Sequence, residues 1–169
     1  MSERPPDALA MVRDWCEQES WAHAKCWGAL RALPELSRGD ARFQRAVDKV
    51  VHIAEARAVW LWRVGARAER PTNIFPDGMT LDEGERLDVR SMETWRGFVE
   101  GLDVGGLSRE VRYQSLDGAS WSNSVLEICT HVWSHGFYHR GQVGLLVNAM
   151  GGTPAGADYI LHARARGSR

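Results

Sequence analysis

The stretch from residue 125 to residue 150 constrains this chain most strongly, because it reads as one long amphipathic helix that carries histidines on one side. Ser124 and Glu127 form the capping box that opens such a helix, and the pair Gly151–Gly152 ends it. Three histidines lie in its middle, at positions 131, 135 and 139. Side chains four residues apart share one face of a helix, with Cβ atoms roughly 5–6 Å apart. One helix can therefore present a pair of imidazoles to a common point.

Only two of these three histidines can bind the same metal ion. His131 and His139 are separated by a rise of about 12 Å along the helix axis, whereas Zn–N bonds measure about 2.0–2.1 Å. The apolar stripe of the helix contains His135 and His139 and leaves His131 toward its edge. Buried polar groups without partners are costly, and a metal ion would satisfy both imidazoles. We therefore expect His135 and His139 to be metal ligands; the alternative is that they are core or surface histidines satisfied by ordinary hydrogen bonds.

Three further stretches show helical periodicity: residues 7–33, 41–67 and 81–102. The second is apolar around most of its circumference, which indicates a helix packed between others, and His52 lies in its middle. Residues 109–121 contain two short alternating runs around an Asp-Gly pair, which predicts a β-hairpin. The sequence thus predicts a single all-α domain over residues 1–169: an antiparallel four-helix bundle with a small β-hairpin before the last long helix.

Two connecting segments complete this prediction. The stretch "DVGGLS", residues 103–108, is expected to break the chain between the third helix and the hairpin. After the last helix, we expect the tail to pack back on the bundle through Tyr159, Ile160 and Leu161.

The composition excludes several classes of protein. The chain has 21 basic and 22 acidic residues, so it lacks the basic surface expected of a nucleic-acid binder. No apolar stretch approaches the ~20 residues that cross a bilayer, and the first residues do not resemble a signal peptide. The three cysteines have no paired spacing, which argues against a disulfide framework or a cysteine zinc site: Cys16, Cys26 and Cys129. We expect a cytoplasmic protein that binds neither nucleic acid nor membranes.

His52 can supply a third nitrogen ligand from across the bundle. Three nitrogen ligands and one open position are the arrangement of catalytic zinc sites, which lower the pKa of bound water to about 7. Other chemistries are disfavoured. Glu55 follows His52 by three residues, but a diiron site needs about four carboxylates and two Glu-x-x-His motifs. Cys129 is more consistent with a buried thiol than with a nucleophile, and the chain has no GxSxG turn.

Three segments together resemble the DinB/YfiT-like superfamily: "VVHIAEARAVWLW", the hairpin "YQSLDG" and "LEICTHVWSHGFYHRGQV". The resemblance implies a four-helix bundle, often dimeric, with a divalent metal ion, zinc or nickel, held by three histidines. Carried over by position, these ligands are His52, His135 and His139, whereas His131 has no settled role. The segment "WAH" resembles a part of the first helix where a small polar residue commonly faces the site. His23 stands there, either beside the ligands or as an additional ligand.

The resemblance also implies a range of activities. Some members of the superfamily resemble thiol-dependent S-transferases that act with low-molecular-weight thiols, and others resemble isomerases or hydrolases. We therefore expect a homodimeric, metal-dependent transferase or hydrolase with a small-molecule substrate, a low-molecular-weight thiol being one candidate. The alternative is a non-catalytic stress-response protein that binds a metal or a small ligand.

Further side chains are candidates for the surroundings of the site. Gln142 lies one turn from His139 and either holds a metal-bound water or substrate, or forms a plain interhelical hydrogen bond. Three aromatic side chains are expected to line a pocket for an apolar or aromatic part of the substrate: Trp60, Phe75 and Trp133. Three imidazoles by themselves suit zinc, nickel, copper or iron.

Overall fold

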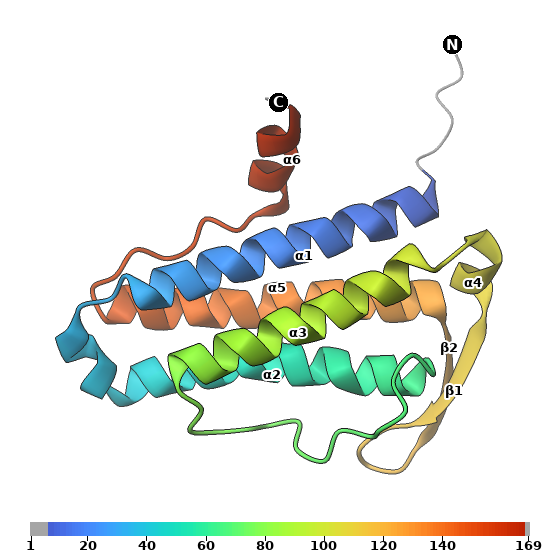
Figure 1. The fold of residues 1–169 in the computed structure, drawn as a ribbon, viewed down its shortest axis with the longest axis horizontal. Helices are drawn as coiled ribbons and strands as arrows, with labels where there is room; N and C mark the ends of the chain where they lie inside the picture. Colours follow the sequence, from blue (N-terminus) through green and yellow to red (C-terminus); the bar gives the residue numbers. More distant parts are fainter. Residues whose placement is uncertain (1–6, 168–169) are drawn as a thin grey trace.

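In a computed structural model, residues 7–167, the part of the chain that the structure describes, form six α-helices, one 3₁₀ helix and a two-stranded antiparallel sheet (Figure 1). The helices are α1 (Ala8–Arg31), α2 (Ala41–Arg63), α3 (Leu81–Glu100), α4 (Val104–Ser108), α5 (Val125–Ala149) and α6 (Tyr159–Gly167), and the 3₁₀ helix is η1 (Glu35–Gly39). The strands are β1 (Glu110–Gln114) and β2 (Ser120–Ser124). The predictions of a mainly helical chain and of a hairpin before the last long helix are confirmed. No helix in the described range is both long and apolar enough to cross a membrane.

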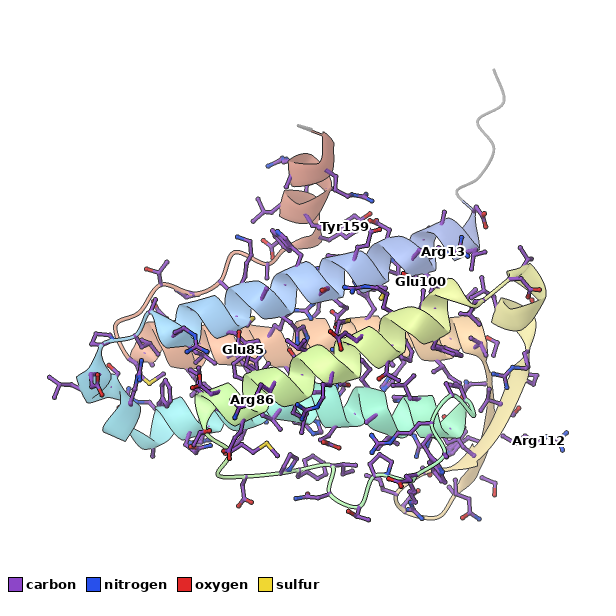
Figure 2. The ribbon with its side chains drawn as sticks, viewed as in Figure 1. Arg13, Glu85, Arg86, Glu100, Arg112 and Tyr159 are labelled. Carbon is purple, nitrogen blue, oxygen red and sulfur yellow. The ribbon has the colours of Figure 1, made fainter. Side chains whose placement is uncertain are left out.

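The four long helices lie side by side, and each of α1 and α2 contacts both α3 and α5 (Figure 1). Side-chain hydrogen bonds add to this packing: Arg13 of α1 donates from Nη2 to the carbonyl oxygen of Leu102, 3.2 Å away, beside Glu100 at the end of α3 (Figure 2). The hairpin closes one end of the helices, and its strands pair from Glu110–Ser124 to Gln114–Ser120.

Two apolar clusters form the core, and a polar layer separates them along every long helix. One cluster lies toward the hairpin and includes Leu61, Val99 and Ile128. The other lies toward η1 and includes Leu30 and Val147. Between them, each long helix contributes buried or half-buried charged and imidazole side chains: Glu19, His23, His52, Arg57, Asp88, His135, His139 and Arg140. This layer contains the candidate site.

The end of α2 differs from its prediction. The helix ends at Arg63, so the predicted extension to residue 67 is wrong. Gly65 adopts a left-handed φ of 81°, and the N–H of Ala66 donates to the carbonyl oxygen of Leu61 at 2.8 Å. This is the Schellman termination, which glycine permits without a steric penalty.

Two segments near the chain's C-terminal half also depart from expectation. The stretch predicted as a break contains the short helix α4, which Asp103 caps by accepting a hydrogen bond from the N–H of Gly106. The tail forms α6, but Ile160 and Leu161 are 53% and 39% exposed, so their predicted packing against the bundle is wrong. Half-buried Tyr159 and buried His162 make the contact instead.

Candidate metal centre

The structure brings His52 of α2 together with His135 and His139 of α5. The centroid of the His52 ring lies 5.2 Å from that of His135 and 4.7 Å from that of His139, and the latter two are 4.4 Å apart. One ring nitrogen of each residue lies within 4.8 Å of the other two. His139 is buried, and the other two rings are half-buried. Three imidazole nitrogens from two helices therefore face a common point.

Hydrogen bonds orient two of the three rings. Nδ1–H of His52 donates to the backbone carbonyl oxygen of Ile74, at 2.7 Å. Nδ1–H of His139 donates to Oε1 of Gln142, at 3.2 Å. A metal-binding imidazole almost always donates its other nitrogen in this way, which fixes the tautomer and leaves the Nε2 lone pair free. The N–H groups thus point away from the cluster and the lone pairs point into it.

The nitrogen–nitrogen distance tests whether the histidines fit a metal ion. Nε2 of His135 and Nε2 of His139 are 3.1 Å apart. Two nitrogens bound to one tetrahedral ion at about 2.05 Å would be separated by about 3.3 Å. With Nδ1 of His139 protonated, its Nε2 presents a lone pair to His135. The distance between the two Nε2 atoms is therefore close to that expected for two nitrogen ligands of one metal ion.

The surroundings keep the imidazoles of α5 neutral. Burial lowers the pKa of His135 to about 3, helped by repulsion from the neighbouring His139 and His52 and opposed by Glu19. Burial also lowers the pKa of His139, with a contribution from His52. Neutral imidazole is the form that binds metal ions. The two histidines of α5 therefore have the donor atoms and the protonation state of metal ligands.

The other predicted site residues lie at different places around the triad. Phe75 is stacked on His52, with ring centroids 4.6 Å apart and planes inclined by 10°. His131 is exposed one turn before His135, and its ring lies 5.2 Å from that of the buried Trp60. Phe75 therefore borders His52 directly, whereas Trp60 borders the triad through His131.

Trp133 lies on another face of α5. Its ring is stacked on that of Trp15 of α1, with centroids 4.7 Å apart, and its Nε1–H donates to Oε1 of Gln18 at 3.1 Å. The structure thus places Trp133 in the contact between α1 and α5 and not beside the triad. From the sequence alone, Trp133 could not be assigned to the triad face or to another face of α5, because the sequence does not show which helix packs against each face.

His23 belongs to a buried cluster of charged residues. Its Nδ1–H donates to Oδ2 of Asp88 at 2.8 Å, and its Nε2 lies 3.5 Å from Glu19. The remaining members are Arg57, which lies 3.2 Å from Asp88, and Arg140, which pairs with Glu19. His23 is not among the residues whose ligand atoms meet at the triad. The pair between Arg140 and Glu19 joins α5 to α1.

The electrostatics of this cluster favour its charged forms. Burial alone would raise the pKa of Asp88, but His23 and Arg57 together hold it well below its usual range. Burial alone would lower the pKa of His23, but Asp88 and Glu19 raise it. Because the charge of Glu19 also acts on His135, the cluster is electrostatically coupled to the triad.

Sequence reasoning did not identify Glu19, Arg57 and Asp88. Each stands at a core-facing position of a helix, four residues from an apolar or histidine neighbour on the same stripe. A charged residue on the apolar stripe of a helix predicts a buried ion pair, because buried charges are paired in folded proteins. This signal was present in the sequence.

Gly136 links the cluster to the triad, since it lies between the two triad histidines of α5. A Cβ atom at this position would lie 2.6 Å from Oε2 of Glu19 and 2.7 Å from Nη1 of Arg140. We expect Gly136→Ala to lower the free energy of unfolding by about 1–3 kcal/mol, because the ion pair must move.

Gly97 is the matched control for this prediction, because it also lies inside a helix but has nothing within 4 Å of an added Cβ. Gly97→Ala should raise the free energy of unfolding by about 0.5–1 kcal/mol. Urea unfolding of both variants measures the difference. Equal stabilities would show that the Glu19–Arg140 pair does not occupy the space beside Gly136.

The alternatives to a histidine site find no support in the geometry. Glu55 lies in a groove between α2 and α3 beside Arg67 and Arg90, and it is not part of the triad's metal-binding group. Cys129 is 3% exposed, and burial raises the pKa of its thiol to about 12. A buried, protonated thiol is a poor nucleophile.

Comparison with known proteins identifies the family of the chain. The sequence model of the DinB family matches residues 11–168. Protein DinB of Bacillus subtilis (strain 168) is 28% identical over 82 residues, which cover 48% of this chain and 46% of that protein. The aligned segment thus spans about half the length of this curated relative. Since the family match extends over nearly the whole sequence, the chain belongs to the DinB family.

Proposed function

We propose that this protein binds one divalent metal ion, zinc or nickel, through Nε2 of His52, His135 and His139, and that it is a metal-dependent enzyme. The observation that carries the proposal is the convergence of one ring nitrogen from each of the three histidines, with the Nδ1–H groups of His52 and His139 held by Ile74 and Gln142. Membership of the DinB family supports it. The scaffold in this proposal is an antiparallel four-helix bundle that holds the ligands on α2 and α5.

The proposed activity is transfer of a low-molecular-weight thiol to a small electrophile, or hydrolysis of a small substrate. Three protein ligands leave a position at which a bound metal ion lowers the pKa of a water or thiol. Around that position, the carbonyl oxygen of Ile74 and Gln142 hold the ligand rings, and Phe75 excludes water from one face of His52. The exposed imidazole of His131 and the ring of Trp60 form a partly apolar wall for a substrate.

A non-catalytic protein that binds a metal or a small ligand is the second candidate. It would use the same three histidines, so metal binding alone does not distinguish the two functions. Turnover does.

The proposal also includes a homodimer in the cytoplasm. Tyr138 and Leu145, spaced seven residues apart on α5, are 67% and 73% exposed, and such apolar side chains favour contact with a second copy. The three cysteines are buried and free, which fits a reducing compartment.

The deciding experiment replaces the native metal with cobalt(II) and titrates a small thiol into the protein. If the open position exists, a sulfur-to-metal charge-transfer absorption should appear, and the metal-loaded protein should transfer the thiol to an electrophile while the apoprotein does not. Thiolate binding without turnover over a panel of electrophiles and esters would favour the non-catalytic candidate. No absorption change and no bound metal would overturn the proposal.

A further inference from the structure

A second group of metal-binding side chains lies where α6 crosses α1, on different elements from His52, His135 and His139. His162 comes from α6, and Asp14 and Glu17 come from adjacent turns of α1. One ligand atom of each residue lies within 4.8 Å of the others. Figure 1 shows α6 standing over α1. The ring of Tyr159 at the start of α6 also lies 6.2 Å from that of Trp133 of α5.

The imidazole of His162 is buried without a hydrogen-bond partner for Nδ1. The residue is 5% exposed, and Nδ1 is among the buried side-chain atoms for which the described residues supply no hydrogen bond. The ring of Trp21 lies 5.5 Å from it and packs against it. An unsatisfied buried nitrogen costs roughly as much as a lost hydrogen bond. A bound group between His162, Asp14 and Glu17 would therefore stabilise the fold by giving Nδ1 of His162 a partner.

Asp14 presents one of its two oxygens to this nitrogen. The hydroxyl of Tyr159, at the start of α6 facing α1 (Figure 2), donates to Oδ2 of Asp14. The other carboxylate oxygen of Asp14, Oδ1, lies 3.9 Å from Nδ1 of His162. Two atoms bound to one zinc ion are separated by about 3.3 Å. A small decrease in the distance between Nδ1 of His162 and Oδ1 of Asp14 would therefore allow both atoms to bind one ion.

Arg166 occupies part of this position. Its Nη1 lies 2.5 Å from Oδ1 of Asp14, and its side chain is 47% exposed in the last turn of α6. A half-exposed arginine at a helix end can turn into solvent at little cost. The guanidinium is thus a competitor that a bound cation would displace from Asp14.

We propose that Nδ1 of His162, Oδ1 of Asp14 and the carboxylate of Glu17 form a second divalent-cation site that fastens α6 to α1. One imidazole and two carboxylates suit zinc and similar borderline cations, whereas calcium and magnesium prefer oxygen ligands alone. Glu17 is exposed, so the ion can enter from solvent. This site is independent of the proposed active site.

The test is zinc stoichiometry, measured by equilibrium dialysis and elemental analysis of untagged protein. The wild-type chain should bind two ions, and Glu17→Gln should weaken the second at least about tenfold while leaving the first unchanged. Glu17 is exposed, so its substitution should not unfold the chain. Glu93→Gln, which removes the same charge from an exposed position on α3, should still bind two ions.

Arg166→Gln should tighten the second ion about tenfold, because the competing cation is gone. In the wild type, zinc should also slow amide exchange in α6. A His139→Ala protein should keep the second ion, so failure of the first site is distinguishable from failure of this one. A His139→Ala chain that binds no ion, or a Glu17→Gln chain that binds as many ions as the wild type with unchanged affinity, would overturn the proposal.

Discussion

A His139→Ala variant should bind a divalent metal ion between α2 and α5 at least about 100-fold more weakly than the wild-type protein. Apparent binding free energies of about 10–16 kcal/mol for four-ligand zinc sites correspond to roughly 2.5–4 kcal/mol for each ligand, and each 1.4 kcal/mol is about tenfold in affinity. His139 is also the ligand whose Nδ1–H is held by Gln142, so the truncation removes an already oriented donor. Competition with a chelator of known affinity measures the change.

His131→Ala is the matched control for this measurement. His131 is on the same helix as His139, but it is exposed and lies outside the group of three histidines whose ligand atoms meet. Its replacement should change the affinity by less than about threefold, corresponding to well under 1 kcal/mol. All the proteins compared should also contain Glu17→Gln, which weakens the second proposed cation site. The measured metal affinity is then that of the triad. An unchanged affinity in His139→Ala would show that the ligand assignment is wrong.

The second large effect is expected in the buried ion cluster. Asp88→Asn should lower the free energy of unfolding by about 3–5 kcal/mol, because it removes the nearer of the two carboxylates that compensate the buried Arg57 and leaves only Glu19, 3.9 Å away. The side chain of Arg57 is 0% exposed and lies 3.2 Å from Asp88. Asp88 also accepts hydrogen bonds from Nδ1 of His23 and from Nε1 of Trp27, both at 2.8 Å. An amide would satisfy only some of these donors and would carry no charge.

Asp82→Asn provides the comparison, since Asp82 is on the same helix and also forms an ion pair. Its side chain is 63% exposed, and its partner Arg31 is 49% exposed. Such a pair contributes at most about 1 kcal/mol, so the variant should unfold close to the wild type in urea. Similar losses in both variants would mean that Asp88 does not compensate a buried charge.

These two effects arise in one layer of the molecule. The triad and the ion cluster lie between two apolar clusters, and Gly136 brings them into contact by leaving room for Glu19 beside the ligand-bearing turn. Changes in the ion cluster should therefore reach the metal site through the position of α5.

Features that depend on a few neighbouring residues were determined by the sequence alone. The capping box of Ser124 and Glu127 starts α5 at the predicted residue, because its hydrogen bonds close within three residues. His135 and His139 share a face because the helical repeat puts them there. The helix end that differs most from its prediction, at Gly65, had its own local signal in the glycine that permits a left-handed φ.

Features that depend on which helices meet were decided only by the tertiary structure. His52 and His139 are 87 residues apart in the chain, and only the packing of α2 against α5 brings their rings within 4.7 Å. The sequence analysis assigned no role to Glu19 and Asp88, which the structure buries, and it predicted packing for Ile160 and Leu161, which the structure exposes. The physical reason is that burial depends on neighbours distant in the chain, whose positions follow from the packing of all four long helices.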